Sequence, residues 1–241
     1  MIIISAGMPR SGTGWIYNLT NDLLAAAGYM PAGRVRKRFM LQWALRPHNN
    51  SVGQPNALKL AGLTLPHLCG QRFAVKTHAS PTRSLRTWVS LGLARVHYSY
   101  RDPRDVVVSA WDEGERMRGR GKTSSFAAYT TKEQTIDAVA GWLRGWDKWM
   151  AYEPALKLRY EDLKADTIGQ LQRIAAHYDL KLTEAQFAPL IEKYAPGNKQ
   201  VGAHFYKGIT GRFRNDLTEA QIALCHEKFG DYIQKMGYGD V

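Results

Sequence analysis

A glycine-rich turn near the amino terminus constrains the fold more than any other part of the sequence. Ile2-Ile3-Ile4-Ser5-Ala6 is a continuous apolar, β-branched run, typical of a strand buried on both faces of a parallel sheet. The turn Gly7-Met8-Pro9-Arg10-Ser11-Gly12-Thr13 follows at once, and apolar residues then recur at helical spacing from Trp15 to Ala27. The chain therefore begins with a strand, a tight turn and a helix, which is the unit of α/β folds.

The same alternation continues along the chain. Strand-like runs recur at 73–76, 95–100 and 156–160, and helical patterns rather than hairpin turns separate them. Helices are predicted after Asp102-Pro103 and over 132–152, 166–178, 183–194 and 218–236. Trp142, Trp146 and Trp149 share one helical face and predict a stripe that packs in the core. We expect one α/β domain over residues 1–241, with a central parallel β-sheet flanked by helices.

The first turn has the Gly-x4-Gly spacing of a Walker A loop, in the strand-to-helix context that such a loop requires. Backbone N–H groups of this turn and the following helix N-terminus favour an anion such as phosphate. Thr13 stands where nucleoside triphosphatases have lysine, and the available cation, Arg10, lies inside the loop. The turn therefore predicts a P-loop-like phosphate site that differs from the magnesium-ATP site. A turn that merely connects strand to helix is the structural alternative.

The net charge of the chain narrows the classes of partner that it can bind. With 33 Lys and Arg against 21 Asp and Glu, the chain carries a net charge of +12, which favours an anionic partner: nucleic acid, an acidic membrane surface or a multiply phosphorylated small molecule. Cys69 and Cys225 lie far apart and suggest neither a disulfide framework nor a zinc site. The apolar run at residues 1–6 is too short for a signal peptide or a membrane span, so we expect a soluble, cytoplasmic protein.

The first turn and the start of the following helix read Pro9-Arg10-Ser11-Gly12-Thr13-Gly14-Trp15. This segment is similar to the PKSGTTW or PRSGTT loop of sulfotransferases that use 3′-phosphoadenosine-5′-phosphosulfate (PAPS). Further resemblances follow in the family's order: Val75-Lys76-Thr77-His78 to the KTH strand end, residues 98–109 to YxxRxPxDxxxS, residues 158–163 to the YEDL turn, and residues 207–215 to RKGxxGxWKN. Tyr206 departs from the arginine of the last motif. Together the motifs span most of the chain.

The resemblance implies two anion sites for one nucleotide, with adenosine 3′,5′-bisphosphate (PAP) as the product. The residues implied to bind the 5′-phosphosulfate end are Arg10, Ser11, Gly12, Thr13 and Gly14, with Trp15 stacked on the adenine. Those implied for the 3′-phosphate are Arg101, Ser109, Lys207 and Gly208, and Tyr160 of the YEDL turn joins the donor site. An ion pair of Arg101 with Asp102 or Asp105 is the structural alternative for that side chain.

The chemistry implied is sulfuryl transfer to a hydroxyl or amine acceptor. Negative charge builds on the bridging oxygen, and Arg10 and Lys76 are the cations that stabilise it. His78, at the predicted end of a strand, is the expected general base, and the carboxylates Glu113 and Glu115 are the fallback. The leaving group is already an acidic phosphate, so no metal is expected.

Two other functions stay open on the residues alone. A P-loop kinase of small metabolites would use the same loop with ATP, and a nucleic-acid binder would use the basic run 34–38 and the Arg/Gly-rich segment 116–122. The sequence does not select the acceptor or the oligomeric state. Loops at 34–43, 63–66 and 113–125 are expected to form the acceptor rim, and their basic character favours a polar or anionic small molecule or a solvated face.

Overall fold

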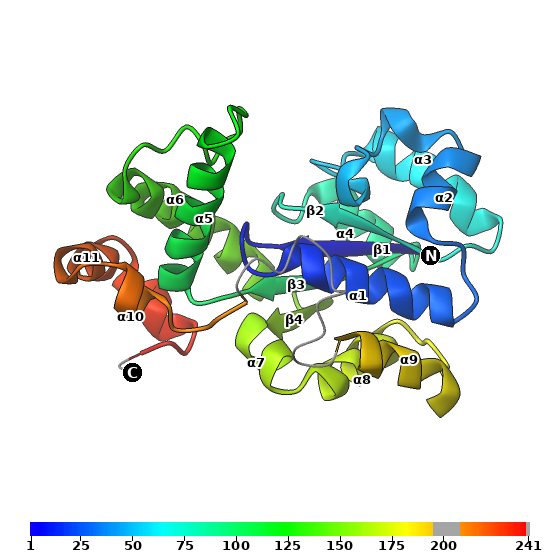
Figure 1. The fold of residues 1–241 in the computed structure, drawn as a ribbon. Helices are drawn as coiled ribbons and strands as arrows, with labels where there is room; N and C mark the ends of the chain where they lie inside the picture. Colours follow the sequence, from blue (N-terminus) through cyan, green and yellow to red (C-terminus); the bar gives the residue numbers. More distant parts are fainter. Residues whose placement is uncertain (195–207, 240–241) are drawn as a thin grey trace.

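The computed structural model describes residues 1–194 and 208–239. Within these ranges, β1 (Ile2–Gly7), β2 (Phe73–Thr77), β3 (Ala94–Tyr100) and β4 (Ala155–Arg159) form one parallel sheet in the order β2-β1-β3-β4 (Figure 1). All of β1 is buried because it pairs with a strand on each side and helices cover both faces. The expected parallel sheet of a single α/β domain is confirmed.

Helices connect and cover the strands. Their bounds are α1 (Thr13–Ala26), α2 (Ala32–Arg38), α3 (Ala57–Leu68), α4 (Arg83–Ser90), α5 (Pro103–Arg118), α6 (Lys132–Met150), α7 (Tyr160–Ala165), α8 (Thr167–His177), α9 (Glu184–Tyr194), α10 (Phe213–Asp216) and α11 (Glu219–Lys235), with the 3₁₀ turns η1 (Leu41–Trp43) and η2 (His48–Asn50). No helix in the described ranges is long and apolar enough to cross a bilayer.

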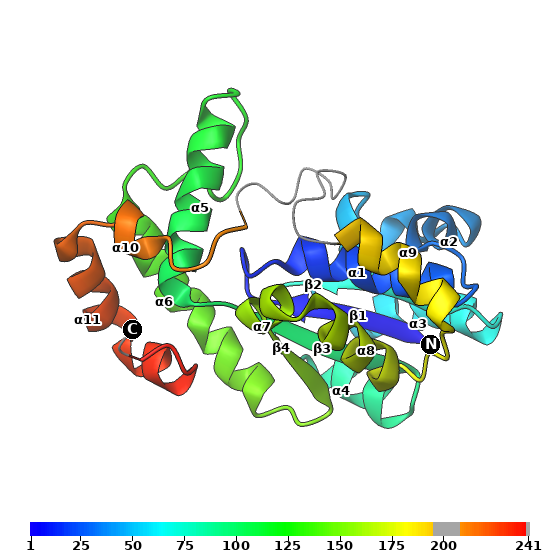
Figure 2. The same ribbon diagram turned by 60° about the horizontal axis from the view of Figure 1, so that its bottom comes forward.

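Alternate side chains of β1 belong to two separate cores. Ile3 packs with the apolar faces of α1 and α8, whereas Ile2 and Ile4 pack with α3, α4 and the inward face of α6. Successive side chains of a strand point to opposite faces of the sheet, so β1 contributes to both cores. Beyond the carboxyl ends of the strands, α5, α6, α10 and α11 form a helical lobe (Figures 1 and 2). The space between this lobe and the sheet edge holds the functional site.

Two local expectations are wrong. The segment 113–125 is not a loop from its start, because α5 continues to Arg118, where the ion pairs Glu113–Arg116 and Glu115–Arg118 link successive turns of the helix. Segments 34–43 and 63–66 are not loops either, because they lie largely in α2, η1 and α3. Of the three tryptophans on α6, Trp146 and Trp149 are buried in the core as expected, while Trp142 lies at its edge.

Candidate active site

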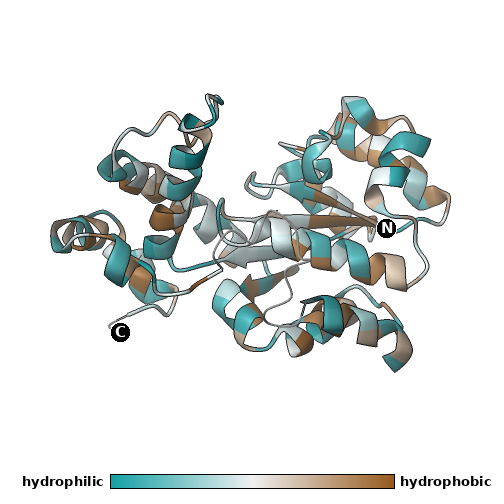
Figure 3. Ribbon diagram, viewed as in Figure 1, coloured by the Kyte–Doolittle hydropathy of each residue, from teal (hydrophilic) through white to brown (hydrophobic). Residues whose placement is uncertain are grey.

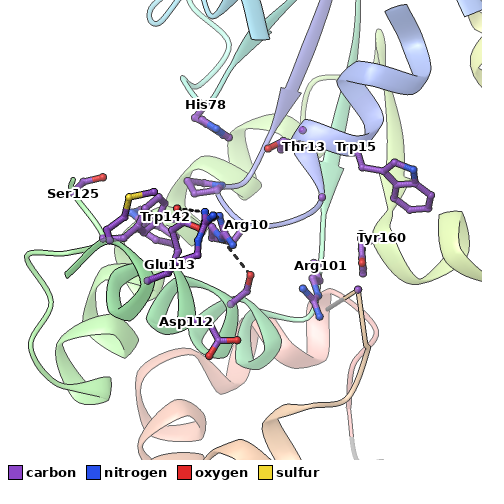
Figure 4. Close-up of a pocket in the computed structure, with 18 of the residues that line it drawn as sticks. Arg10, Thr13, Trp15, His78, Arg101, Asp112, Glu113, Ser125, Trp142 and Tyr160 are labelled. Carbon is purple, nitrogen blue, oxygen red and sulfur yellow. Dashed lines mark hydrogen bonds and ion pairs between the residues drawn. The ribbon is translucent and has the colours of Figure 1, made fainter. Parts of the chain in front are cut away.

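A pocket of about 550 Å³ opens at the carboxyl ends of β1, β2 and β3. Open α/β sheets bind their ligands at this edge, where the strand order reverses between β2 and β3 on either side of β1. Figure 4 shows Trp15, Tyr160 and Arg101 on one side, Trp142, Glu113 and Ser125 on the other, and Arg10 between them. The pocket therefore has two ends. After the roles that the motif resemblance implies, we name them the nucleotide end (Trp15, Tyr160 and Arg101) and the acceptor end (Trp142, Glu113 and Ser125).

The turn between β1 and α1 is shaped by two close approaches. Gly12 has φ +76°, and a Cβ there would lie 2.6 Å from the Tyr160 ring. A Cβ on Gly7 would lie 2.2 Å from Ser99 Oγ. Gly12 is the N-cap of α1, and no side chain in the described residues caps that end. The first N–H groups of α1 therefore face the pocket without an intrahelical partner and can bind an anion.

Ser11 differs from its neighbours in the turn. Its side chain is fully buried, its hydroxyl donates to the Met8 carbonyl (2.7 Å), and its backbone N–H donates to the same carbonyl (3.2 Å). Ser11 does not line the pocket, whereas Gly12, Thr13 and Gly14 do. The structure thus gives Ser11 the role of holding the turn in shape.

Arg10 adopts a left-handed backbone conformation (φ 66°), which directs its side chain out of the turn toward α5. Nε donates to Ser109 Oγ (3.2 Å), and Nη1 lies 3.3 Å from Glu113 Oε2. Glu113 also accepts two hydrogen bonds from Arg116. Burial lowers the pKa of Arg10, and the Glu113 carboxylate opposes that shift. The guanidinium is thus a permanent cation at the centre of the pocket.

Arg101, at the end of β3, lies at the nucleotide end. It forms the ion pair with Asp105 that the sequence offered as the structural alternative to phosphate binding. Nη2 lies 3.0 Å from Asp105 Oδ2 and donates to the Ile209 carbonyl (2.6 Å). Asp105 also accepts from the N–H groups of Gly211 (2.7 Å) and Phe213 (3.1 Å). This carboxylate therefore fastens segment 208–213 to Arg101.

Arg101 still has donor capacity that the protein does not use. Its buried Nε has no hydrogen-bond partner in the described part of the chain. An unsatisfied buried donor costs about 1–3 kcal/mol, so a ligand acceptor at this position would be stabilising. The guanidinium also lies over the Tyr160 ring, 4.6 Å from its centroid, and Tyr160 meets Trp15 edge to face at 6.0 Å. Both aromatic side chains are buried and line the pocket.

Lys76 and His78 come from the end of β2. Burial, and then the Arg10 cation, lower the pKa of Lys76 to about 8. His78 Nδ1 lies 2.7 Å from the Gly7 carbonyl, which can only accept, so Nδ1 carries the proton and Nε2 has the free lone pair. Desolvation by surrounding protein atoms, followed by Lys76 and Arg10, lowers the pKa of His78 to about 4, although His78 is an exposed residue that lines the pocket. A neutral imidazole with a free Nε2 can act as a base near neutral pH.

The acceptor end contains groups that the sequence did not single out. Its apolar walls are Met117, Phe126, Tyr129 and Trp142. The ionic groups His48, Asp112, Arg116 and Arg212 also line the pocket, and Arg212 pairs with Asp112 (2.8 Å). Glu113 was foreseen only as a fallback base, whereas Glu115 pairs with Arg118 and does not line the pocket. The i, i+3 spacing of Glu113 and Arg116, on a helix that continues past residue 113, was the sequence signal that could have predicted their ion pair.

Three residues predicted for the donor site remain: Ser109, Gly208 and Lys207. Ser109 and Gly208 line the pocket, and Gly208 accepts a hydrogen bond from Lys164 through its carbonyl. Lys207 lies outside the described residues. In the described ranges, no cluster of three or more His, Cys, Asp or Glu side chains is placed to hold a metal ion.

Comparisons with known proteins agree on one family. The family model of the sulfotransferase domain matches residues 2–238. Cytosolic sulfotransferase 15 of Arabidopsis thaliana is 26% identical over 76% of this chain and 53% of its own length, and the luciferin sulfotransferase of Photinus pyralis is 26% identical over 79% and 54%. The chain thus spans about half the length of these relatives.

Solved structures share the fold. A mouse sulfotransferase complexed with PAP superposes with a TM-score of 0.58 at 16% identity, covering 97% of this chain and 84% of that one. Retinol dehydratase, in complex with androsterone and PAP, gives 0.57 at 21% identity, covering 97% and 80%.

Proposed function

The chain belongs to the sulfotransferase domain family, and we propose that it transfers the sulfuryl group of PAPS to a small-molecule hydroxyl or amine acceptor. The observation that carries this proposal is the placement of two separate anion sites in one pocket, the uncapped α1 N-terminus and the Arg101 guanidinium. A nucleotide with phosphate groups at both its 5′ and 3′ positions needs both sites. The PAP complexes of the mouse sulfotransferase and of retinol dehydratase support the same ligand.

The nucleotide end fits such a donor. The N-terminus of α1, with Gly12, Thr13 and Gly14, would hold the 5′-phosphosulfate, while Arg101 with Ser109 would hold the 3′-phosphate. Trp15 and Tyr160 supply aromatic surface for the adenine, and Gly208 borders the same end. Lys207, in the same motif, is part of the proposal by resemblance alone.

The reaction we propose is a single in-line displacement at sulfur. His78 Nε2 accepts the acceptor's proton as the new S–O bond forms and the bond from sulfur to the bridging phosphate oxygen breaks, with PAP as the leaving group. Arg10 and Lys76 stabilise the charge that grows on the bridging oxygen. Glu113 pairs with both Arg10 and Arg116, so we keep it as the fallback base behind His78.

The acceptor end favours a molecule with a planar or apolar body and a polar group. Phe126, Tyr129 and Trp142 supply the apolar contacts, and the Glu113–Arg116 pair supplies ionic ones. The androsterone and retinol ligands of retinol dehydratase support the small-molecule class. The names of the cytosolic relatives support a cytoplasmic location, which is part of the proposal.

Calorimetric titration with PAP and with magnesium-ATP separates the candidates. We expect PAP to bind and to compete with labelled PAPS, and we expect sulfuryl transfer to at least one member of a panel of phenols, alcohols and sugars. Preference for magnesium-ATP would favour the kinase alternative. Binding of duplex DNA with steep salt dependence, and no nucleotide binding, would favour the nucleic-acid alternative.

A further inference from the structure

The excess of positive over negative charge lies in one segment of the chain. Residues 23–101 contain twelve Lys and Arg and no Asp or Glu, while the rest of the chain has 21 of each, so this segment carries the whole net charge of +12. Only Lys76 and Arg101 of these twelve cations line the pocket. Donor binding therefore leaves most of the segment's charge unexplained.

Three of the other cations are exposed on α2. Arg34, Lys37 and Arg38 all face solvent, and none of them has a carboxylate nearby in sequence. Met40, two residues after the end of α2, is 76% exposed, and Trp43 of η1 is 54% exposed. The cations and these two apolar side chains thus occur within ten residues.

Helix α3 has an exposed apolar stripe. Leu58, Leu65 and Leu68 are 71%, 52% and 74% exposed, and they recur at i, i+7 and i+10 on one helical face. The opposite face of α3 is already buried against the sheet. Trp43 joins the two elements, because its ring packs over Gly62 of α3, where a Cβ would lie 2.5 Å from a ring carbon.

We name the exposed side chains of α2, residue 40, η1 and α3 the α2–α3 surface, in which η1 packs against α2 and its Trp43 packs against α3. Five of the eight large hydrophobic side chains that are exposed in the described residues belong to it. Figure 3 shows hydrophobic positions on α3 and hydrophilic positions on α2, and Figure 1 shows both helices at the end of the sheet away from the helical lobe. Clustering of this kind marks an interaction site, whereas single exposed leucines do not.

We propose that the α2–α3 surface docks on a lipid bilayer that carries anionic headgroups. Leucine, methionine and tryptophan side chains would enter the headgroup boundary, and Arg34, Lys37 and Arg38 would face the phosphates, as in helices that lie in the plane of a membrane interface. This inference does not depend on the proposed reaction.

Charge selects the bilayer over a second copy of the chain. A symmetric dimer through this surface would bring the α2 cations of both copies together, and residues 23–101 have no carboxylate to neutralise them. Aliphatic side chains on α3 also suit lipid better than nucleic acid, because bases bind to aromatic platforms.

The test is cosedimentation of the full chain with vesicles of phosphatidylcholine, with and without phosphatidylglycerol, at low and high salt. We expect binding only when the anionic lipid is present. The triple variant Arg34→Ala/Lys37→Ala/Arg38→Ala should lose roughly 100-fold in affinity, about fivefold for each cation near an anionic surface. The matched control Arg144→Ala/Lys148→Ala/Lys181→Ala removes three exposed cations elsewhere and should bind nearly as the parent does.

A second pair of variants tests the apolar contribution. Leu58→Gln/Leu65→Gln should weaken the binding that survives at high salt, whereas Ile168→Gln, at an exposed position on α8, should not. Thermal melting and PAP titration check that each variant is folded. No binding to anionic vesicles, or equal losses in the α2 triple variant and its control, would overturn the proposal. Self-association or DNA binding through the same residues without vesicle binding would also overturn it.

Discussion

Replacing Arg101 by alanine separates a ligand contact from a structural ion pair. The guanidinium has one buried donor without a partner among the described residues, and its other contacts hold Asp105 and the Ile209 carbonyl. Loss of a charge-assisted hydrogen bond to the 3′-phosphate costs about 1.5–3 kcal/mol, so PAP affinity should fall roughly 10- to 150-fold. AMP has no 3′-phosphate, and its affinity should fall only to the extent that the pocket itself is damaged.

The structural cost of the same change is predictable. Asp105 keeps the Gly211 and Phe213 N–H groups, while the Ile209 carbonyl loses its donor, so we expect about 1–3 kcal/mol less stability. Arg104→Ala is the matched control, because Arg104 is equally buried, pairs with Asp102 and the Tyr238 carbonyl, and does not line the pocket. Calorimetry with both nucleotides on both variants gives the answer. If the ratio of PAP to AMP affinity changes equally in the two variants, or in neither, Arg101 does not contact the 3′-phosphate.

Three further outcomes are expected. His78→Ala should lower turnover by about 10²- to 10⁴-fold while PAP affinity stays within a few fold; near-parental turnover would instead direct attention to Glu113. In an NMR titration of the donor-free protein, His78 should show a pKa near 4, with the proton of the neutral ring on Nδ1. Bound PAP should raise that pKa, because its negative charge favours the imidazolium. A pKa near 6.5 without ligand would contradict the described surroundings of His78. Gly12→Ala should abolish PAP binding and lower the melting temperature, since φ +76° and the Tyr160 ring both oppose a Cβ; measurable PAP affinity in this variant would show that the turn can adapt.

Local patterns predicted the sheet, and most of the residues predicted for the donor site line one pocket. The apolar runs of β1 and β3 follow directly from burial on both faces, and the turn between β1 and α1 follows from its glycines. The pocket gathers Arg10, Lys76 and His78 because they stand at or just beyond the ends of β1 and β2. The carboxyl ends of parallel strands meet at one edge, so such residues are placed by topology alone.

Features that depend on contacts across the fold could not be predicted. The partner of Arg10 is Glu113, more than a hundred residues away, and the buried role of the Ser11 hydroxyl depends on the neighbouring β3 backbone. Helix α3 escaped detection because Leu58, Leu60, Leu63 and Leu65 place apolar groups on both faces, which hides the helical period. Its Pro66, near the end, is a further signal against a helix.

The strand order β2-β1-β3-β4 has a consequence for the order of events in a reaction. On the proposed placement, the end of β3 binds the 3′-phosphate of the nucleotide, the turn after β1 binds the phosphosulfate that reacts, and the end of β2 carries the base. The three roles therefore lie side by side along the carboxyl edge of the sheet. The acceptor and the nucleotide then occupy different ends of one pocket. Neither has to leave before the other arrives, and the two substrates can meet in a ternary complex without a covalent enzyme intermediate.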